Sequence, residues 1–477
     1  MKNTGLLMIM ELGIRLTDAL VALVVARYLG PLDFGLLAAA LSFAWLFSIL
    51  PGFGMGSLTT RDIAQDPGQM GSYIGNGLAA KVMLAGLTFI VMGAVAWVSG
   101  FAATRALAVM LAGILMVVDT NVRYLLSFFQ AVQWMGTMTV VSLFIRAGWV
   151  VGSLWVMGMH GGVLHLLGIR VLVTATGFLV SLALIHWKLS RLSWRFSPPV
   201  IFRMLKDSLP FAVFRLRGQL YMDIDTVMVS LMRGDLMTGW YAAAQKFLRV
   251  LSFIPDSFAN ALLPELAGSQ AAGASRAAAR TLGRICRYLS IIGFPVAVVV
   301  SLLAGRIVLL LYGPAYAPAV PALQILIWGV PFTFLNGALL AALAAANQER
   351  KGSGYLILGA LFSSLSNFAV IPLFGHVGAA STTFLAEVFI FVLQVRLLGK
   401  TLPGFTPLER RHIGPLVTTL AGLGAAAFLT RSLPWAASIP LMAIVYAGFL
   451  LAFRLVEAAD WQFLRKRRLK TAPADLG

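Results

Sequence analysis

The sequence has little of what a soluble enzyme needs. Only 12% of its 477 residues are charged, about half the share of an ordinary soluble domain, whereas 59% are hydrophobic. It holds a single cysteine, Cys286, which excludes an intrachain disulfide and leaves a thiolate metal site without a second sulfur ligand. The composition therefore predicts a protein that lies in a membrane.

Long polar segments are also missing. Connections of some length are expected only at residues 188–207, 264–287 and 400–412, followed by a tail after residue 456. None of these connections is long enough to form a separate catalytic domain, so no catalytic residue, resident metal or cofactor is expected. The N-terminus lacks a small-residue cleavage site and is expected to be the first membrane helix, not a signal peptide.

Apolar segments of about 20 residues, the length that crosses a bilayer, recur along the whole chain. Fourteen are predicted, which makes the chain an all-α polytopic membrane protein. They are centred on residues 8–28, 36–57, 74–99, 103–130, 136–159, 161–187, 208–232, 237–263, 288–312, 318–346, 353–373, 376–399, 413–431 and 436–455. The predicted organisation is an N-terminal six-helix lobe (1–190), a basic cytoplasmic linker (191–207), a C-terminal six-helix lobe (208–400), helices 13 and 14 (401–456) and a basic tail (457–477).

An internal repeat relates the two predicted lobes. Residues 25–64 recur 204 positions later without a gap. The matched positions are Gly30/Gly234, Leu32/Leu236, Gly35/Gly239, residues 38–40/242–244, Ser48/Ser252, Pro51/Pro255 and Leu58/Leu262. The alternative is that small residues, which are common in apolar helices, match by chance. Two related bundles are typical of transporters that rock one half against the other, and the paired prolines predict a shared bend.

The net charge of +19 is distributed unevenly along the chain. If the N-terminus is cytoplasmic, the even-numbered connections and the tail hold 22 of the 37 basic residues, and the outside ends hold about four. The positive-inside rule then predicts a multi-pass protein of the cytoplasmic membrane with both termini in the cytoplasm. The basic run at residues 465–470 is interpreted as a topology anchor or a contact for anionic membrane lipids, and no nucleic-acid partner is expected.

Eleven basic residues fall within or at the edge of the predicted spans, where each ionisable group costs about 2.5–3.5 kcal/mol unless it faces protein or water. They are Arg15, Lys81, Arg123, Arg146, Arg170, Arg215, Arg217, Lys246, Arg249, Arg306 and Arg454. Arg306 and Arg454 lie near predicted ends and are expected to snorkel. The spans hold only about eight acids, so the charge within them is positive.

Helical spacing places several of these charges on shared faces. The sets are Glu11, Arg15 and Asp18; Asp119 and Arg123; Arg217, Tyr221 and Asp225; and Lys246 and Arg249. Ion pairs that hold helices together are one interpretation. The surplus of arginine favours another, a hydrated cavity for an anionic substrate, because guanidinium groups bind phosphate through two parallel hydrogen bonds.

Several motifs together resemble one transporter family. The segment from Ala26 to Arg61 resembles the opening two helices of the Wzx-type polysaccharide flippases, including the turn A-R-x-L-G-P-x-D-F-G. Residues 223–267 are similar to the start of that family's second half, with Asp225 at its characteristic acid. Further matches are LLYGPAYAPAVPALQIL from Leu310, Asn336, and IPLFGHVGAA from Ile371. The stretch AAANQER at 344–350 departs from the family pattern, with Asn347 in place of a glycine.

The resemblance implies a protein that moves a polyprenyl-pyrophosphate-linked oligosaccharide across the cytoplasmic membrane by alternating access. The substrate-binding candidates are Arg15, Arg123, Arg146, Arg215, Arg217, Tyr221, Lys246 and Arg249. Coupling to H⁺ or Na⁺ would fall to Asp18, Asp119, Asp223 or Asp225. Membrane lipids and a polysaccharide polymerase or glycosyltransferases are the other expected partners.

Three further readings stay open. A multidrug extruder of the same superfamily would share the fold, but should prefer an acid-rich cavity for cationic drugs. A non-transporting scaffold would bind the lipid-linked precursor for other enzymes without turnover. A membrane glycosyltransferase or polymerase should carry acidic motifs on a long outside loop, and no outside connection here is long enough.

Overall fold

The computed structural model describes residues 2–189, 196–251, 275–430 and 433–453; the side chains of residues 2–16, 213–222, 250, 410, 435–436 and 439 lie outside the description. All regular elements of this part are helical, as predicted. They are α1 (Lys2–Leu46), α2 (Ile49–Gly52), α3 (Met55–Gln65), η1 (Pro67–Gln69), α4 (Met70–Val98), α5 (Ala103–Ala131), α6 (Met135–Gly158), α7 (Val163–Lys188), α8 (Pro198–Leu251), α10 (Ser275–Tyr312), η2 (Pro314–Ala319), α11 (Val320–Leu326), α12 (Gly329–Ala345), α13 (Glu349–Thr401), α14 (Arg410–Leu429) and α15 (Trp435–Ala452).

Membrane-length helices account for most of the described chain. Eight helices are long and apolar enough to cross a membrane, and nine if η2–α11 and α12, bent by 44°, are counted as one span. The long helices α1, α8 and α13 are each broken at one glycine with non-helical backbone angles, namely Gly30, Gly234 and Gly375. With these helices counted as two arms each, the described helices follow the order of the predicted spans; residues 252–263 of the eighth predicted span and residues 454–455 of the last lie outside the described residues.

The repeat is visible in the backbone. Gly30 has φ 74° and ψ 172°, and its counterpart Gly234 has φ 79° and ψ 179°, a conformation that only glycine adopts readily. A Cβ atom on Gly35 would lie 1.7 Å from the carbonyl oxygen of Asp235, and one on Gly239 would lie 1.8 Å from that of Pro31. Because these positions are equivalent in the repeat, the two lobes meet through the same backbone contact made twice.

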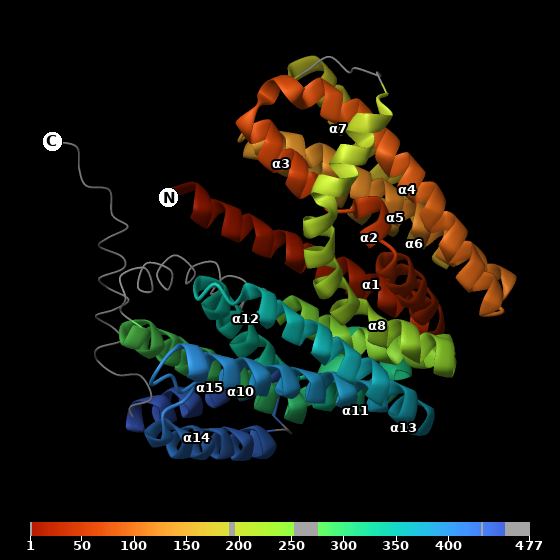
Figure 1. The fold of residues 1–477 in the computed structure, drawn as a ribbon. Helices are drawn as coiled ribbons and strands as arrows, with labels where there is room; N and C mark the ends of the chain where they lie inside the picture. The colour runs from red at the N-terminus through yellow and green to blue at the C-terminus, as the bar shows by residue number, and fades with distance from the viewer. Residues whose placement is uncertain (1, 190–195, 252–274, 431–432, 454–477) are drawn as a thin grey trace.

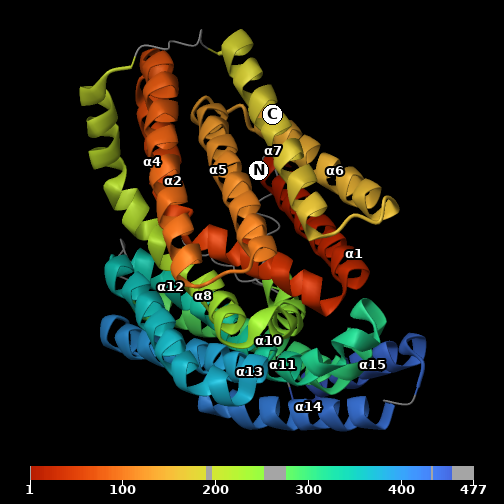
Figure 2. The same cartoon turned by 90° about the vertical axis from the view of Figure 1, so that its right-hand side faces the viewer.

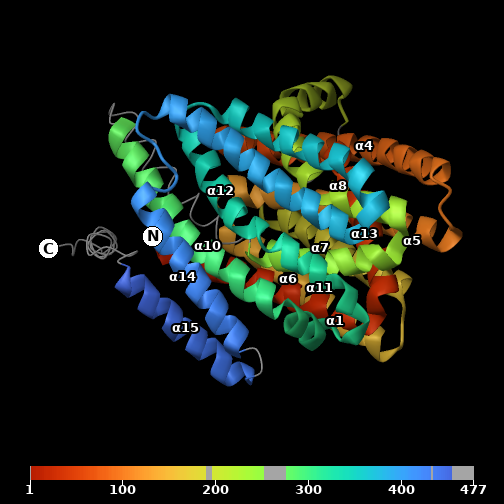
Figure 3. The same ribbon diagram turned by 90° about the horizontal axis from the view of Figure 1, so that it is seen from below.

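The helices form two lobes that diverge from this contact. Helices α1 to α7 make one lobe and α10 to α13 the core of the other (Figure 1), and the second view shows the first lobe standing on the second (Figure 2). Helix α8 joins them, because its N-terminal part contacts α2, α3 and α4 while it also packs on α1 and α13. Helices α14 and α15 lie outside α10 (Figure 3).

The second span differs from the helix predicted over residues 36–57. Its helical arm ends at Leu46, and the short helix α2, which contains Pro51, precedes α3. Phe53 and Gly54 between α2 and α3 both adopt left-handed conformations. A bend near Pro51 was expected from the sequence, and the equivalent bend at Pro255 lies outside the described residues.

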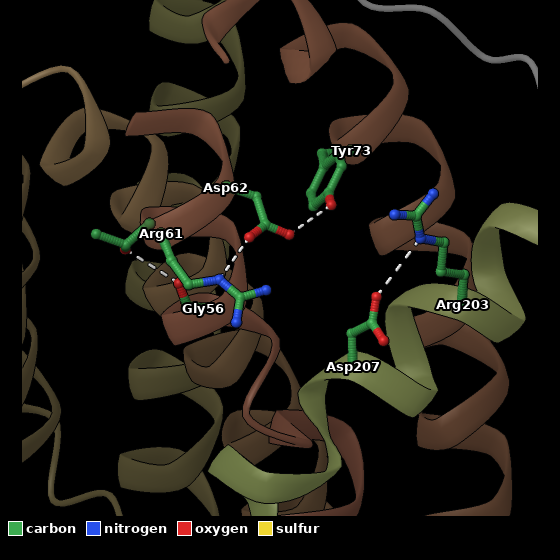
Figure 4. Close-up of polar contacts among 7 residues, drawn as sticks. Gly56, Arg61, Asp62, Tyr73, Arg203 and Asp207 are labelled. Atoms are coloured by element: carbon green, nitrogen blue, oxygen red, sulfur yellow. Dashed lines mark hydrogen bonds and ion pairs between the residues drawn. The ribbon is translucent and has the colours of Figure 1, made fainter. Parts of the chain in front are cut away.

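One end of the N-terminal lobe carries a cluster of polar side chains where α3, α4 and α8 meet (Figure 4). Asp62 lies 2.7 Å from Arg61 Nε and accepts a hydrogen bond of 2.7 Å from the Tyr73 hydroxyl. Arg203 and Asp207 form a longer ion pair of 3.6 Å within α8. Residues 198–207, the last part of the expected basic linker, are therefore the first turns of α8.

Candidate functional site

The described part of the N-terminal lobe contains a cavity of about 460 Å³ between α1, α5, α6 and α7. Five charged side chains line it: Asp18, Asp119, Arg123, Arg146 and Arg170. They come from four different helices, so the cavity forms only when the lobe packs. The remaining lining includes hydroxyl and amide groups as well as apolar side chains, a surface that can hold water and a polar ligand.

Two of the three arginines form ion pairs. Arg123 Nε lies 2.6 Å from Asp119 Oδ2, the i, i+4 pair that the spacing predicted. Arg146 on α6 forms an ion pair with Asp18 on α1. Arg170 lies over the ring of Trp149, with its guanidinium carbon 5.0 Å from the ring centre. Three guanidinium groups and two carboxylates give the cavity wall a positive surplus.

The second arm of α8 carries two further cations, Lys246 and Arg249. Arg249 donates to Asp223 at 2.9 Å and to Gln245 at 3.2 Å. Lys246, three residues earlier, interacts electrostatically with Arg170 and Asp18 of the N-terminal lobe as well as with Arg249. Lys246 is therefore the α8 cation that interacts with charges of the N-terminal cavity.

The predicted site residues divide into three sets. The N-terminal cavity brings together Asp18, Asp119, Arg123 and Arg146; of the α8 candidates, Lys246 interacts with Arg170 and Asp18 of this cavity, whereas Arg249 pairs with Asp223. Arg15 lies on α1, and Arg215, Arg217 and Tyr221 lie on α8, but their side chains fall outside the described part of the chain. The two acids Asp223 and Asp225 lie in different environments, although one residue separates them.

Asp225 lies in a buried network of neutral donors between α8 and α13. Its Oδ1 atom accepts hydrogen bonds from Ser363 at 3.0 Å and from Asn367 at 2.7 Å, and its Oδ2 atom accepts one from Thr383 at 2.8 Å. The Tyr241 hydroxyl lies 3.0 Å from the Thr383 hydroxyl. Within the described residues no basic side chain forms an ion pair with Asp225, in contrast to Asp18, Asp119 and Asp223.

Oxygen atoms dominate this network, and hard cations such as Na⁺ prefer oxygen ligands. The hydroxyl oxygens of Ser363 and Thr383 lie 3.0 and 2.8 Å from the carboxylate of Asp225, whereas Asn367 turns its amide nitrogen to Asp225 and its amide oxygen to Thr382. A proton or a cation held there would neutralise a carboxylate that is only 5% exposed. No group of three or more His, Cys, Asp or Glu side chains suited to a transition metal occurs in the described ranges.

Two basic residues that are not among the predicted site residues, Arg170 and Lys81, each line a cavity of the N-terminal lobe. Arg170 was counted among the buried bases but has no acid at helical spacing, and its neighbours in the cavity come from α1, α5 and α6. Lys81 on α4 is 1% exposed and donates a hydrogen bond to the carbonyl oxygen of Pro51. The signal that could have singled out both is the cost of a charge in a membrane span.

The comparison with protein families agrees with this architecture. A family described as "Polysaccharide biosynthesis protein" matches residues 1–270, more than half of the chain. The MatE family matches residues 210–369, which include the second copy of the repeat. The two matches overlap on α8, the helix that joins the lobes.

Curated relatives match parts of the chain. An uncharacterized membrane protein of Methanocaldococcus jannaschii is 28% identical over 159 residues, which are 33% of this chain and 31% of the relative. The probable flippase AglR of Haloferax volcanii is 22% identical over 197 residues, 41% of each protein. The chain thus matches between about a third and two-fifths of the length of these relatives.

Solved structures share the fold over nearly the whole chain. The lipid II flippase MurJ in an inward closed conformation has a TM-score of 0.72 at 13% identity, covering 94% of this chain and 98% of that one. An inward-facing multidrug resistance MATE family transporter has a TM-score of 0.58 at 15% identity, covering 83% and 98%. The chain is therefore a multi-pass membrane protein with the fold of these transporters, and it belongs to the polysaccharide biosynthesis protein family.

Proposed function

We propose that this protein moves a polyprenyl-pyrophosphate-linked oligosaccharide across the cytoplasmic membrane by alternating access between its two lobes. The observation that carries the proposal is the cation surplus of the N-terminal cavity, where three arginines face two carboxylates. A pyrophosphate cannot enter hydrocarbon without compensating charge, and guanidinium groups supply it with directed hydrogen bonds. The membership in a polysaccharide biosynthesis family supports the same substrate class.

The two-lobed architecture supports the alternating movement. The lobes meet at the paired contacts of Gly35 with Asp235 and of Gly239 with Pro31, and they diverge from there. A rocking movement would open this end and close the other, so that the polar headgroup crosses within the protein while the isoprenoid tail stays in lipid. We place the diverging end in the cytoplasm, because the basic connections lie on the Arg61 and Arg203 side of the spans.

In this proposal, Asp225 couples transport to an ion gradient. Among the four predicted acids, Asp18, Asp119 and Asp223 are each paired with an arginine, whereas Asp225 is surrounded by neutral donors. A carboxylate in such a site can exchange H⁺ or Na⁺ without breaking an ion pair. Because helix α13 supplies Ser363, Asn367 and Thr383, binding of a cation would tie α8 to α13.

The test is a transport measurement in liposomes. The purified protein is reconstituted with a fluorescent undecaprenyl-pyrophosphate oligosaccharide, and movement between leaflets is followed with and without H⁺ and Na⁺ gradients. We expect protein-dependent movement that the Arg146→Gln, Arg170→Gln double variant loses. Arg306→Gln is the matched control, because Arg306 donates to the carbonyl oxygen of Leu433, far from the cavity.

Two outcomes would contradict the proposal. Binding of the lipid without movement under every gradient would make the protein a scaffold that holds the precursor for a polymerase or a glycosyltransferase. Transport of cationic drugs with no movement of the pyrophosphate lipid would make it a multidrug extruder. The cation-rich cavity argues against the second alternative, since like charges repel.

A further inference from the structure

A second, smaller cavity of about 300 Å³ opens beside the main one, between the break in the second membrane span and helices α4 and α5. Both cavities share Arg123, Ser127 and Gln130 in their linings, so they are neighbouring compartments with a common wall. We propose that this side pocket is a phosphoryl subsite, which holds a phosphate group of the lipid-linked pyrophosphate beside Lys81. The proposal rests on the proposed function for the source of the phosphate.

The chemistry of the lining favours an anion. Lys81 and Arg123 are its charged residues among the described side chains, and no carboxylate lines the pocket itself. The other polar groups are hydroxyls and an amide, from Ser57, Thr60, Thr120, Tyr124, Ser127 and Gln130. Hydrogen-bond donors around two cations match the acceptor oxygens of a phosphoryl group.

Lys81 is the central residue of this pocket. Its side chain is only 1% exposed, and its ammonium nitrogen lies 5.6 Å from the centre of the Tyr124 ring. Tyr124 can take this place because Gly77 leaves room for it, as a Cβ on Gly77 would lie 1.8 Å from the Tyr124 hydroxyl. A buried lysine is costly within a membrane protein, and an incoming phosphate would gain a charge-assisted hydrogen bond from it.

The backbone around the pocket adds to the attraction. Gly56 and Ser57 line the pocket from the first turn of α3, an 11-residue helix without a side-chain cap at its N-terminus. The Ser57 N–H donates to the Gly54 carbonyl at 3.1 Å, so the contribution of this helix start is the positive end of its dipole, which favours an anion. The pocket thus combines side-chain cations with the positive end of a helix.

A phosphoryl group in the pocket would also affect the break in the second membrane span. Lys81 donates to the carbonyl oxygen of Pro51, in the short helix α2 between the helical arm of α1 and α3. A phosphoryl group would compete with this carbonyl for the lysine ammonium. Binding of the anion therefore changes a contact that fixes α2, which links the substrate to the shape of this span.

Protection of an introduced cysteine tests the subsite without measuring transport. Gly56→Cys places a thiol in the pocket with space for it, since a Cβ there meets only Ser127 at 3.8 Å, and the native Cys286 is buried. A negatively charged thiosulfonate reagent labels the full-length protein in detergent, with inorganic pyrophosphate or geranyl pyrophosphate as the protecting probe. The control is Gly136→Cys, an exposed position on α6 that lies outside the pocket.

We expect both probes to slow labelling of Gly56→Cys and to leave Gly136→Cys unchanged. Adding Lys81→Met should weaken protection by about tenfold or more, the loss of one charge-assisted hydrogen bond, whereas Lys81→Arg should keep most of it. Lys351→Met is the matched control, because Lys351 is exposed on α13. Thermal melting checks that each variant is folded.

Equal protection in Lys81→Met and in the unchanged pocket would overturn the subsite, as would equal protection of both cysteines. Protection by inorganic pyrophosphate but not by geranyl pyrophosphate would overturn the assignment to a lipid headgroup. Because the readout does not require movement between leaflets, a protein that binds both probes but never transports the lipid would refute the proposed function and keep the subsite.

Discussion

In the N-terminal lobe each aspartate that lines the cavity lies beside an arginine, whereas Asp225 of α8 lies among neutral donors, unlike Asp223 of the same helix, which pairs with Arg249. A carboxylate paired with a guanidinium group offsets part of the positive charge of the cavity. An acid among hydroxyl and amide groups can gain or lose a cation without leaving a buried charge unpaired. In the proposed function, the first lobe therefore holds the anionic substrate and Asp225 holds the coupling ion.

Reversing one charge in the N-terminal cavity should have the largest effect. Arg170→Glu replaces the arginine over Trp149 with a third carboxylate in the same wall. We expect transport of the pyrophosphate lipid to fall by about a hundredfold or more, the cost of turning an attractive contact into a repulsive one. Arg306→Glu, with the same charge change outside the cavity, should stay near the unchanged rate in the liposome assay. Equal losses in both variants would remove the special role of the cavity.

Neutralising Asp225 should act on coupling instead. Asp225→Asn keeps the shape of the side chain but removes the charge that a cation would balance. The rate should become independent of the imposed ion gradient and fall by about tenfold, while binding of the lipid stays unchanged. Transport rates with and without H⁺ and Na⁺ gradients measure this, and lipid binding to the detergent-solubilised variant is the second readout. A gradient response preserved in Asp225→Asn would contradict the division between the lobes.

Substitutions at the two equivalent glycines of the contact between the lobes should destabilise the protein by similar amounts. Gly35→Ala and Gly239→Ala each place a methyl group less than 2 Å from a backbone carbonyl oxygen of the other lobe. We expect each to destabilise the observed state by about 1–3 kcal/mol, as overpacking does elsewhere. Thermal unfolding in detergent measures the effect, with Gly136→Ala as a control in open space. One strong and one negligible effect would show that the repeat does not make two equivalent contacts.

Removing a polar pair at the exposed end of the lobe should matter least. Asp207→Asn breaks the 3.6 Å contact with Arg203, whose side chain is 85% exposed. Exposed ion pairs contribute about 0–1 kcal/mol, so melting temperature and transport should stay within error of the unchanged protein. Asp62→Asn should cost more, because Asp62 also accepts from the Tyr73 hydroxyl. A large transport defect in Asp207→Asn would point to a role of this end that its exposure does not suggest.

Much of the fold could be predicted from the sequence, because long apolar runs and repeated glycines record membrane spans and turns directly. Gly30 and Gly234, matched across 204 positions, adopt nearly the same backbone angles in the structure. The break after Leu46 was harder to place. A turn at residues 47–48 ends the helical arm, and the left-handed residues Phe53 and Gly54 then separate α2 from α3; a hydrophobic run shows neither break.

The positive charge of the candidate cavity could be predicted from the sequence, but most of the contacts between its side chains could not. Asp119 and Arg123 were matched correctly because their partners lie one helical turn apart. Arg146 forms an ion pair with Asp18, which is 128 residues away in the sequence, and Arg170 lies over the ring of Trp149 on another helix. Asp223 and Asp225 fall in different environments because side chains two residues apart on a helix point in different directions. Contacts between helices decide these cases, and spacing along one helix cannot give them.

The most direct test of the central claim compares two lipids in the same liposomes. Both carry the same oligosaccharide and isoprenoid chain, but one has a pyrophosphate linkage and the other a neutral ether linkage. If the cation-lined cavity recognises the phosphate, the protein moves the pyrophosphate lipid, and the neutral lipid crosses no faster than in protein-free liposomes. Equal protein-dependent movement of both lipids would contradict the account, because the arginines of the cavity would then have no part in selecting the substrate.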